Sequence, residues 1–283
     1  MLGSLSFSFL GAQDDALVDR LPRSGEWVFR WLPKPFQRDP TLDVTVMTDV
    51  FTAGNLDPPA SPDHPIYVQL YAAGAKVLGE PYHEKLPEPP LVERALTDAL
   101  AHNGYLPAGP GQQPKLLIVF YWGTHNAMDR ELASMFPEVD LRERMERARL
   151  IGGADQIRHM RTIAEWGESI LDHNQKYEYL RDQALGDLYF VVASAYDYQG
   201  ISAGRRTLMW RTKMTVSGRG VSAVETVRPI LAAAAPFFGR QMPEPAVAMP
   251  RLRRWEVIVG KPVVIETDIT PPPLPSAGVP TKP

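Results

Sequence analysis

The sequence predicts a mixed fold of the α/β (α+β) class, in which helices pack on a mixed β-sheet and a helical insertion separates two central strands. Two continuous runs of β-branched and aromatic residues, 115–123 and 188–198, are typical of strands buried on both faces. The segment between them, 129–185, is polar and charged and lacks strand patterns. A helical apolar stripe over 91–104 directly precedes the first run. Strands and helices that alternate in this way indicate one layered α/β domain.

The elements before the first run follow from local patterns. Residues 26–32 and 42–50 alternate apolar and polar side chains, which predicts two strands. Residues 66–78 fit either a strand or a short helix, and both alternatives stay open. The helix over 91–104 begins after two prolines and ends at Asn103-Gly104, a C-terminal cap.

The insertion predicts two helical stretches, 129–151 and 154–185, with an interruption near Pro137. They form either a helical lid or a crossover between neighbouring strands. The first stretch contains a run in which four arginines alternate with Glu143 and Glu146, and this run predicts a solvated helix face stabilised by i,i+3 and i,i+4 ion pairs. The four arginines are Arg142, Arg144, Arg147 and Arg149.

The second half of the chain continues the pattern. Residues 206–216 alternate cleanly and predict a hairpin partner for 188–198. Ser222 and Glu225 have capping-box spacing at the start of a helix that reaches Phe238. Two short runs within 255–267 predict a last strand pair.

We therefore assign a single domain to 14–268, with the insertion at 129–185. A disordered Pro-rich tail follows at 269–283.

Composition excludes several classes of protein. The chain has 283 residues, of which 44% are hydrophobic, enough to bury a sizeable core. Lys and Arg total 30 against 33 for Asp and Glu, so nucleic acid is not an expected partner. The sequence has no cysteine, which rules out disulfides, thiol nucleophiles and Cys-ligated metals. No apolar run approaches the roughly 20 residues of a transmembrane span.

Residues 1–13 are apolar and small, and two aspartates follow them. This pattern matches the second half of a secretory signal peptide, with Ala12 at the cleavage position, but without the basic first part. A truncated export signal is favoured over a first strand or helix of a cytoplasmic protein. The expected location is the periplasm or cell envelope, with the cytoplasm as the alternative.

Histidine spacing predicts no metal site. The six histidines form no HExxH motif, and no two lie four residues apart on one helix. A metal site would have to be assembled from distant segments. No nucleotide-binding glycine pattern is complete either, so we expect no cofactor.

A polar cluster follows the first apolar run. In a functional interpretation, His125 is an acid, base or ligand whose ring Asn126 or Asp129 orients, and Trp122 and Thr124 lie beside it. In a structural interpretation, 123–126 is a turn in which Thr124 or Asn126 caps the next helix. The structural interpretation is favoured. His125 and Asp129 remain the catalytic candidates, and Trp122, Thr124 and Asn126 the binding candidates.

Aromatic side chains on the later strands form either a binding platform or cross-strand pairs, of which the pairs are favoured. They are Tyr189, Tyr196, Tyr198 and Trp210.

The order of the elements resembles that of uncharacterised exported bacterial proteins and, more remotely, the DUF4136 family of envelope lipoproteins. The resemblance covers roughly residues 40 to 240 and lies in KLLIVFYWG, LYFVVASAYDYQ, RTLMWRTKMTV and SAVETVRPILAAAAPFFG. The chain departs from the lipoproteins in having no lipidated Cys and in its long polar insertion. The resemblance implies an envelope-associated α/β domain and no functional residues.

These observations favour a non-catalytic envelope protein that binds or assembles with an unknown protein or small molecule, and that associates with the envelope peripherally. The alternative is a hydrolase that uses His125 and a nearby carboxylate at the end of the strand 115–123. An enzyme is the less favoured of the two.

Overall fold

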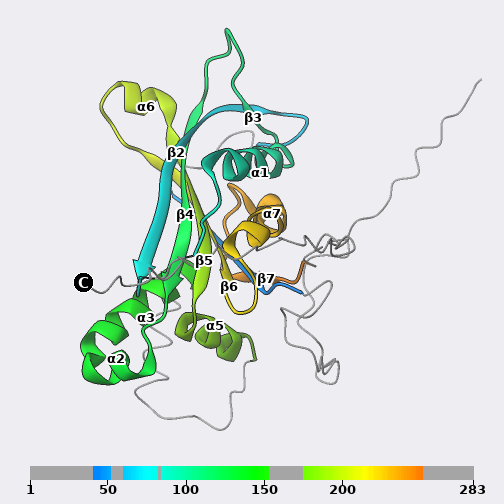
Figure 1. Ribbon diagram of the computed structural model, residues 1–283. Helices are drawn as coiled ribbons and strands as arrows, with labels where there is room; N and C mark the ends of the chain where they lie inside the picture. The colour runs from blue at the N-terminus through cyan, green and yellow to red at the C-terminus, as the bar shows by residue number, and fades with distance from the viewer. Residues whose placement is uncertain (1–40, 52–59, 82–83, 153–174, 251–283) are drawn as a thin grey trace, which may run out of the picture. The chain divides into compact units, whose positions relative to one another are not determined.

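The computed structural model describes four parts of the chain, all within the unit Met1–Arg253 (Figure 1). They are residues 41–51, 60–81, 84–152 and 175–250. The predictions for the signal segment 1–13, for the strand 26–32, for the strand pair in 255–267 and for the tail 269–283 concern residues outside these parts.

A seven-stranded mixed sheet organises the described residues, in the order β3-β2-β4-β5-β6-β1-β7. Strand β2 runs parallel to β3 and β4, and the other neighbours are antiparallel. The strands are β1 (Val44–Val50), β2 (Ile66–Gly79), β3 (Tyr105–Pro107), β4 (Leu116–Asn126), β5 (Leu188–Asp197), β6 (Leu208–Ser217) and β7 (Ala246–Ala248). The predicted mixed α/β class is confirmed.

Helices lie on both faces of the sheet and in its connections. They are α1 (Pro89–Ala101), α2 (Arg130–Met135), α3 (Pro137–Gly152), α5 (Gln175–Leu185), α6 (Tyr198–Ser202) and α7 (Ala223–Ala234), with a 3₁₀ turn, η3 (Ala235–Phe237). The described part of the insertion is helical as predicted, and its interruption falls at Phe136, between α2 and α3. No helix in the described residues is long and apolar enough to cross a membrane.

The segment 66–78, which the sequence left open, is the strand β2. Its first three residues, Ile66 to Val68, pair with β3 on one side, and the residues from Val68 to Gly79 pair with β4 on the other. The register shifts between Ala72 and Ala75, and Gly74 within this bulge has φ of +94°. The segment is therefore a strand in spite of the helical spacing of its tyrosines, because it pairs with strands that are distant in sequence.

The main core lies between one face of the sheet and the helices α1 and α7. Ser222 and Glu225 form the predicted capping box, since the Ser222 hydroxyl accepts from the Glu225 backbone and the Glu225 carboxylate accepts from the Ser222 backbone. Pro229 stays inside α7. The core includes Phe120, Trp122, Trp210 and Phe238, together with Leu96 and Leu100 of α1 and Leu231 of α7.

The opposite face is covered by α3 and α5 at one end of the sheet, below β4 and β5 in Figure 1. A second, smaller apolar cluster joins these helices to β5 through Ala148, Ile151, Leu180, Ala184 and Leu188. The insertion thus packs on the sheet where β4 ends and β5 begins.

Only one of the two apolar runs is buried on both faces. In β5, every residue from Leu188 to Ala195 is buried. In the first half of β4, the residues toward the main core are buried, whereas Leu117, Val119 and Tyr121 on the other face are half-buried. The prediction of two-sided burial is therefore wrong for this half of β4.

Candidate functional site

Strand β4 continues through the polar residues 123–126 instead of turning. His125 pairs with Leu188 of β5, and Asn126 pairs with Gly79 of β2. The next helix, α2, is capped by Asp129, whose Oδ1 accepts from the Leu132 backbone at 2.8 Å. The interpretation of 123–126 as a helix-capping turn is wrong, because strands on both sides supply hydrogen-bond partners for an extended backbone.

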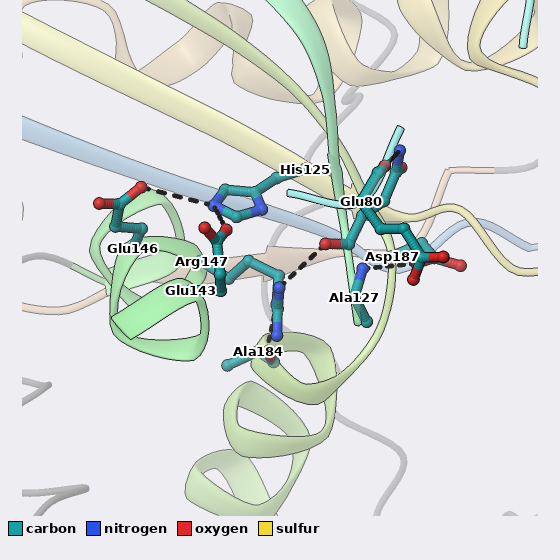
Figure 2. A network of polar contacts seen from close by, with 9 residues as sticks. Glu80, His125, Ala127, Glu143, Glu146, Arg147, Ala184 and Asp187 are labelled. Atoms are coloured by element: carbon teal, nitrogen blue, oxygen red, sulfur yellow. Dashed lines mark hydrogen bonds and ion pairs between the residues drawn. The ribbon is translucent and has the colours of Figure 1, made fainter. Parts of the chain in front are cut away.

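Helix α3 places two carboxylates against His125, which projects from the end of β4 (Figure 2). The distance from His125 Nε2 is 3.6 Å to Glu143 Oε2 and 3.8 Å to Glu146 Oε2. Residues three apart on a helix share one face, so both glutamates reach the same imidazole. We call His125, Glu143 and Glu146 the His–Glu cluster.

The imidazole of His125 is enclosed. Its side chain is 0% exposed, while those of Glu143 and Glu146 are 20% and 46% exposed. Among the described residues, neither ring nitrogen has a hydrogen-bond partner. Burial lowers the pKa of His125, the positive charge of Arg147 lowers it further, and Glu143 acts in the opposite direction. The neutral imidazole is the form that this environment favours at neutral pH.

Arg147, on the next turn of α3, is also fully buried. Its Nε donates to the Ala184 carbonyl at 2.7 Å and its Nη1 to the Asn126 carbonyl at 3.1 Å (Figure 2). Burial lowers the pKa of Arg147, and the negative charges of Asp140 and Glu143 oppose that shift. A buried cation therefore connects β4, α3 and α5.

The other predicted site residues serve neighbouring backbone groups. Trp122 Nε1 donates to the Pro87 carbonyl at 3.0 Å, and Asn126 Nδ2 donates to the Glu80 carbonyl at 2.7 Å. Thr124 is buried opposite Tyr189. With Asp129 at the α2 cap, the one predicted residue that faces the carboxylates of α3 is His125.

Sequence reasoning missed Glu143, Glu146 and Arg147. It assigned all of them to a solvated helix face, which is wrong for Arg147 although Arg142, Arg144 and Arg149 are exposed. The i,i+3 spacing of the two glutamates was visible, but charged helices offer such pairs everywhere, so the spacing did not identify a site.

Comparisons with known proteins assign no family. No family model matches the chain, and no curated protein matches it. Among solved structures, a dodecamer of a PelC variant from Paraburkholderia phytofirmans aligns with 70% of this chain and 99% of its own, at 10% identity and a TM-score of 0.31. A PDZ domain protein from Parabacteroides distasonis aligns with 74% of this chain and 39% of its own, at 10% identity and a TM-score of 0.36. Such TM-scores establish no shared fold.

Proposed function

We propose that the protein is a non-catalytic binding or assembly protein that acts at the bacterial cell envelope. The observation that carries the non-catalytic part is the closure of the strand end. Trp122, His125 and Asn126 are at most 7% exposed. A general acid or base must come within hydrogen-bond reach of its substrate, and an enclosed imidazole offers no such approach.

The half-buried face of the sheet supports the binding part. Tyr71 pairs with Val119 and Tyr196 pairs with Leu117, so both tyrosines lie on the half-buried face of β4. Tyr121 lies on the same face and is contacted by Lys76, whose Nζ is 4.3 Å from the ring centroid.

Arg211 extends this surface, because its Nε donates to Ser194 Oγ at 3.1 Å beside β4. We define the tyrosine face as Tyr71, Lys76, Tyr121, Tyr196 and Arg211. Tyrosine and arginine are among the residues enriched at protein interfaces, since each offers a large contact area and a polar end. Of the aromatic residues that the sequence singled out, Tyr196 lies here, whereas Tyr189 and Trp210 belong to the core.

Site-specific photo-crosslinking in the cell that encodes the protein tests the binding proposal. A photoreactive phenylalanine analogue replaces Tyr71, which is 60% exposed, and in a control it replaces Leu141 of α3, also 60% exposed. We expect a discrete adduct from position 71 that is absent from position 141 and weakened by Tyr121→Ala. No adduct at position 71, or equal adducts at both positions, would overturn the proposal.

The envelope location rests on residues 1–13, whose pattern matches the second half of an export signal and lacks the basic first part. Fractionation of the native host and intact mass of the purified protein test it. We expect the protein in the periplasmic or envelope fraction, with an N-terminus at Gln13. Recovery from the cytoplasm with residues 1–12 still attached contradicts export.

The alternative function is a hydrolase that uses His125 with a nearby carboxylate. Its support is the pair of carboxylates at 3.6 and 3.8 Å from Nε2. The test is a panel of ester and glycoside substrates, with His125→Gln beside the unmodified protein. Turnover that His125→Gln abolishes would favour the hydrolase over the binding protein.

A further inference from the structure

We propose that the His–Glu cluster binds a divalent transition-metal ion of the Zn²⁺ class, which connects α3 to the end of β4. The ligand atoms of His125, Glu143 and Glu146 all lie within 4.8 Å of one another. This inference goes beyond the proposed function, because a bound ion at this position stabilises the fold whether or not the tyrosine face binds a partner.

The buried polar atoms of the cluster do not satisfy one another by hydrogen bonding, and a cation would satisfy them. His125 Nε2 and Glu143 Oε2 are buried, and neither has a hydrogen-bond partner among the described residues. If Nε2 carries a proton, 3.6 Å is too long for a hydrogen bond to Glu143. If Nε2 carries a lone pair, that lone pair faces carboxylate oxygens. A metal ion satisfies all of these atoms at once, because each offers it a lone pair.

The two distances from His125 Nε2 fit a small ion. Ligand atoms at about 2.0 to 2.1 Å from a tetrahedral Zn²⁺ lie roughly 3.3 to 3.4 Å apart. The observed 3.6 and 3.8 Å therefore need to close by only a few tenths of an ångström. Glu146 is 46% exposed, so its side chain can make this adjustment.

The donor set selects the class of metal. One imidazole nitrogen with two carboxylate oxygens suits Zn²⁺, Fe²⁺, Mn²⁺ and Co²⁺, whereas Ca²⁺ and Mg²⁺ prefer oxygen ligands alone. Two carboxylates match the charge of a divalent ion. Arg147 is a nearby cation. Its guanidinium donates to the carbonyls of Ala184 and Asn126, and the negative charge of Asp140 stabilises it.

The fold also holds in place the residue that follows His125. Asn126, next to the ligand His125, is fixed by Arg147 through its carbonyl and by Glu80 through its side-chain amide. These bonds fix the end of β4 at the residue that follows His125. Figure 2 shows the imidazole directed at both carboxylates while the guanidinium of Arg147 turns toward the carbonyls.

Titration of the full chain with Zn²⁺, after a chelator has been used and removed, tests the proposal. We expect one ion per chain by calorimetry, a rise in the melting temperature, and visible absorption bands of a low-symmetry site with Co²⁺. Glu146→Gln removes one ligand at a half-exposed position and should weaken Zn²⁺ binding about tenfold or more. Glu138→Gln, an exposed substitution on the same helix, is the matched control and should bind as the unmodified chain does.

His125→Gln removes the nitrogen ligand, and circular dichroism checks that this variant folds. If the unmodified chain binds no Zn²⁺ at about 100 µM, the proposal is overturned. Binding that Glu146→Gln leaves unchanged also overturns it, since surface histidines such as His64 then account for the ion. Both results leave the crosslinking and fractionation tests of the proposed function unaffected.

Discussion

Arg147 donates from Nη1 to the backbone carbonyl of Asn126 across 3.1 Å, so a buried guanidinium on α3 holds the last residue of β4. A second bond, from Nε to the Ala184 carbonyl, fixes the end of α5 to the same side chain. The strand β4 and the helices α3 and α5 are thereby joined at one point inside the protein.

Replacement of Arg147 by Met should lower the free energy of unfolding by about 3 kcal/mol, because two buried carbonyls lose their donor. Urea unfolding followed by circular dichroism measures the change. Arg142→Met, at an exposed position on the same helix, should change stability by less than about 0.5 kcal/mol. Equal effects at the two positions would mean that the hydrogen bonds of Arg147 contribute nothing.

A methyl group at Gly79 should disturb the His–Glu cluster from the β2 side. A Cβ there would lie 2.1 Å from the Asn126 carbonyl oxygen and 3.1 Å from His125 Nδ1, and the backbone has φ of +72°. Gly79→Ala should therefore cost about 3 kcal/mol or more, through positive-φ strain plus overpacking.

Gly74→Ala is the control for the effect of φ alone. Gly74 has φ of +94°, and no described atom lies within 4 Å of its added Cβ. We expect a loss of about 1 kcal/mol, measured by the same urea unfolding. If the two alanine variants are equally stable, the close approach at Gly79 is relieved without cost.

The hydroxyls of Thr48 and Thr212 should show strong energetic coupling. They lie 2.8 Å apart and are fully buried, at paired positions of β1 and β6. Thr48→Val or Thr212→Val alone leaves one hydroxyl without its partner and should cost about 1 to 2 kcal/mol. The double variant should be more stable than the sum of the two losses implies, by about 1 kcal/mol, in a double-mutant cycle of denaturation data. Additive losses would contradict the hydrogen bond.

Stability above pH 10 should depend on Tyr105. Burial raises the pKa of Tyr105 from 10.0 to about 12, with Trp210 and Arg240 acting in the opposite direction. The unfolded chain loses this proton near pH 10 while the folded protein still retains it. The stabilisation is therefore complete below pH 10 and is lost as pH rises toward 12.

Melting curves between pH 8 and about 11.5 test this dependence. The difference in stability between the unmodified protein and Tyr105→Phe should shrink as pH rises above 10. Tyr71→Phe, which changes a phenol that is 60% exposed, should show no such trend. A constant difference for Tyr105→Phe contradicts the raised pKa.

Elements with strong local signals could be predicted from the sequence. The strand β5 and the helix α7 carry their apolar pattern and caps within themselves, and both were predicted close to their observed bounds. The three-residue strands β3 and β7 were not predicted, because strands so short are defined by their partners β2 and β1 rather than by any pattern of their own.

The candidate site was predicted in part. His125 was selected because it follows a buried strand, and the structure encloses it between β4 and α3. The carboxylates of Glu143 and Glu146 could not be connected to it from sequence, since the angle at which α3 returns to the sheet is set by packing of Ile151 and Leu180 against Leu188. The same packing buries Arg147, although a charged residue within a charged stretch of helix is usually solvated.

The position of β1 between β6 and β7 has a consequence for the order in which the protein folds. The paired residues Thr48 and Thr212 are 164 positions apart, so β1 has no partner until most of the chain has been synthesised. Asn126 and Arg147, which share a hydrogen bond, are in contrast only 21 positions apart and can meet early. Contacts between distant segments form slowly. We therefore expect the contact between β4 and α3 to form before β1 pairs with β6. Until then, the apolar residues of β1 are accessible to a chaperone.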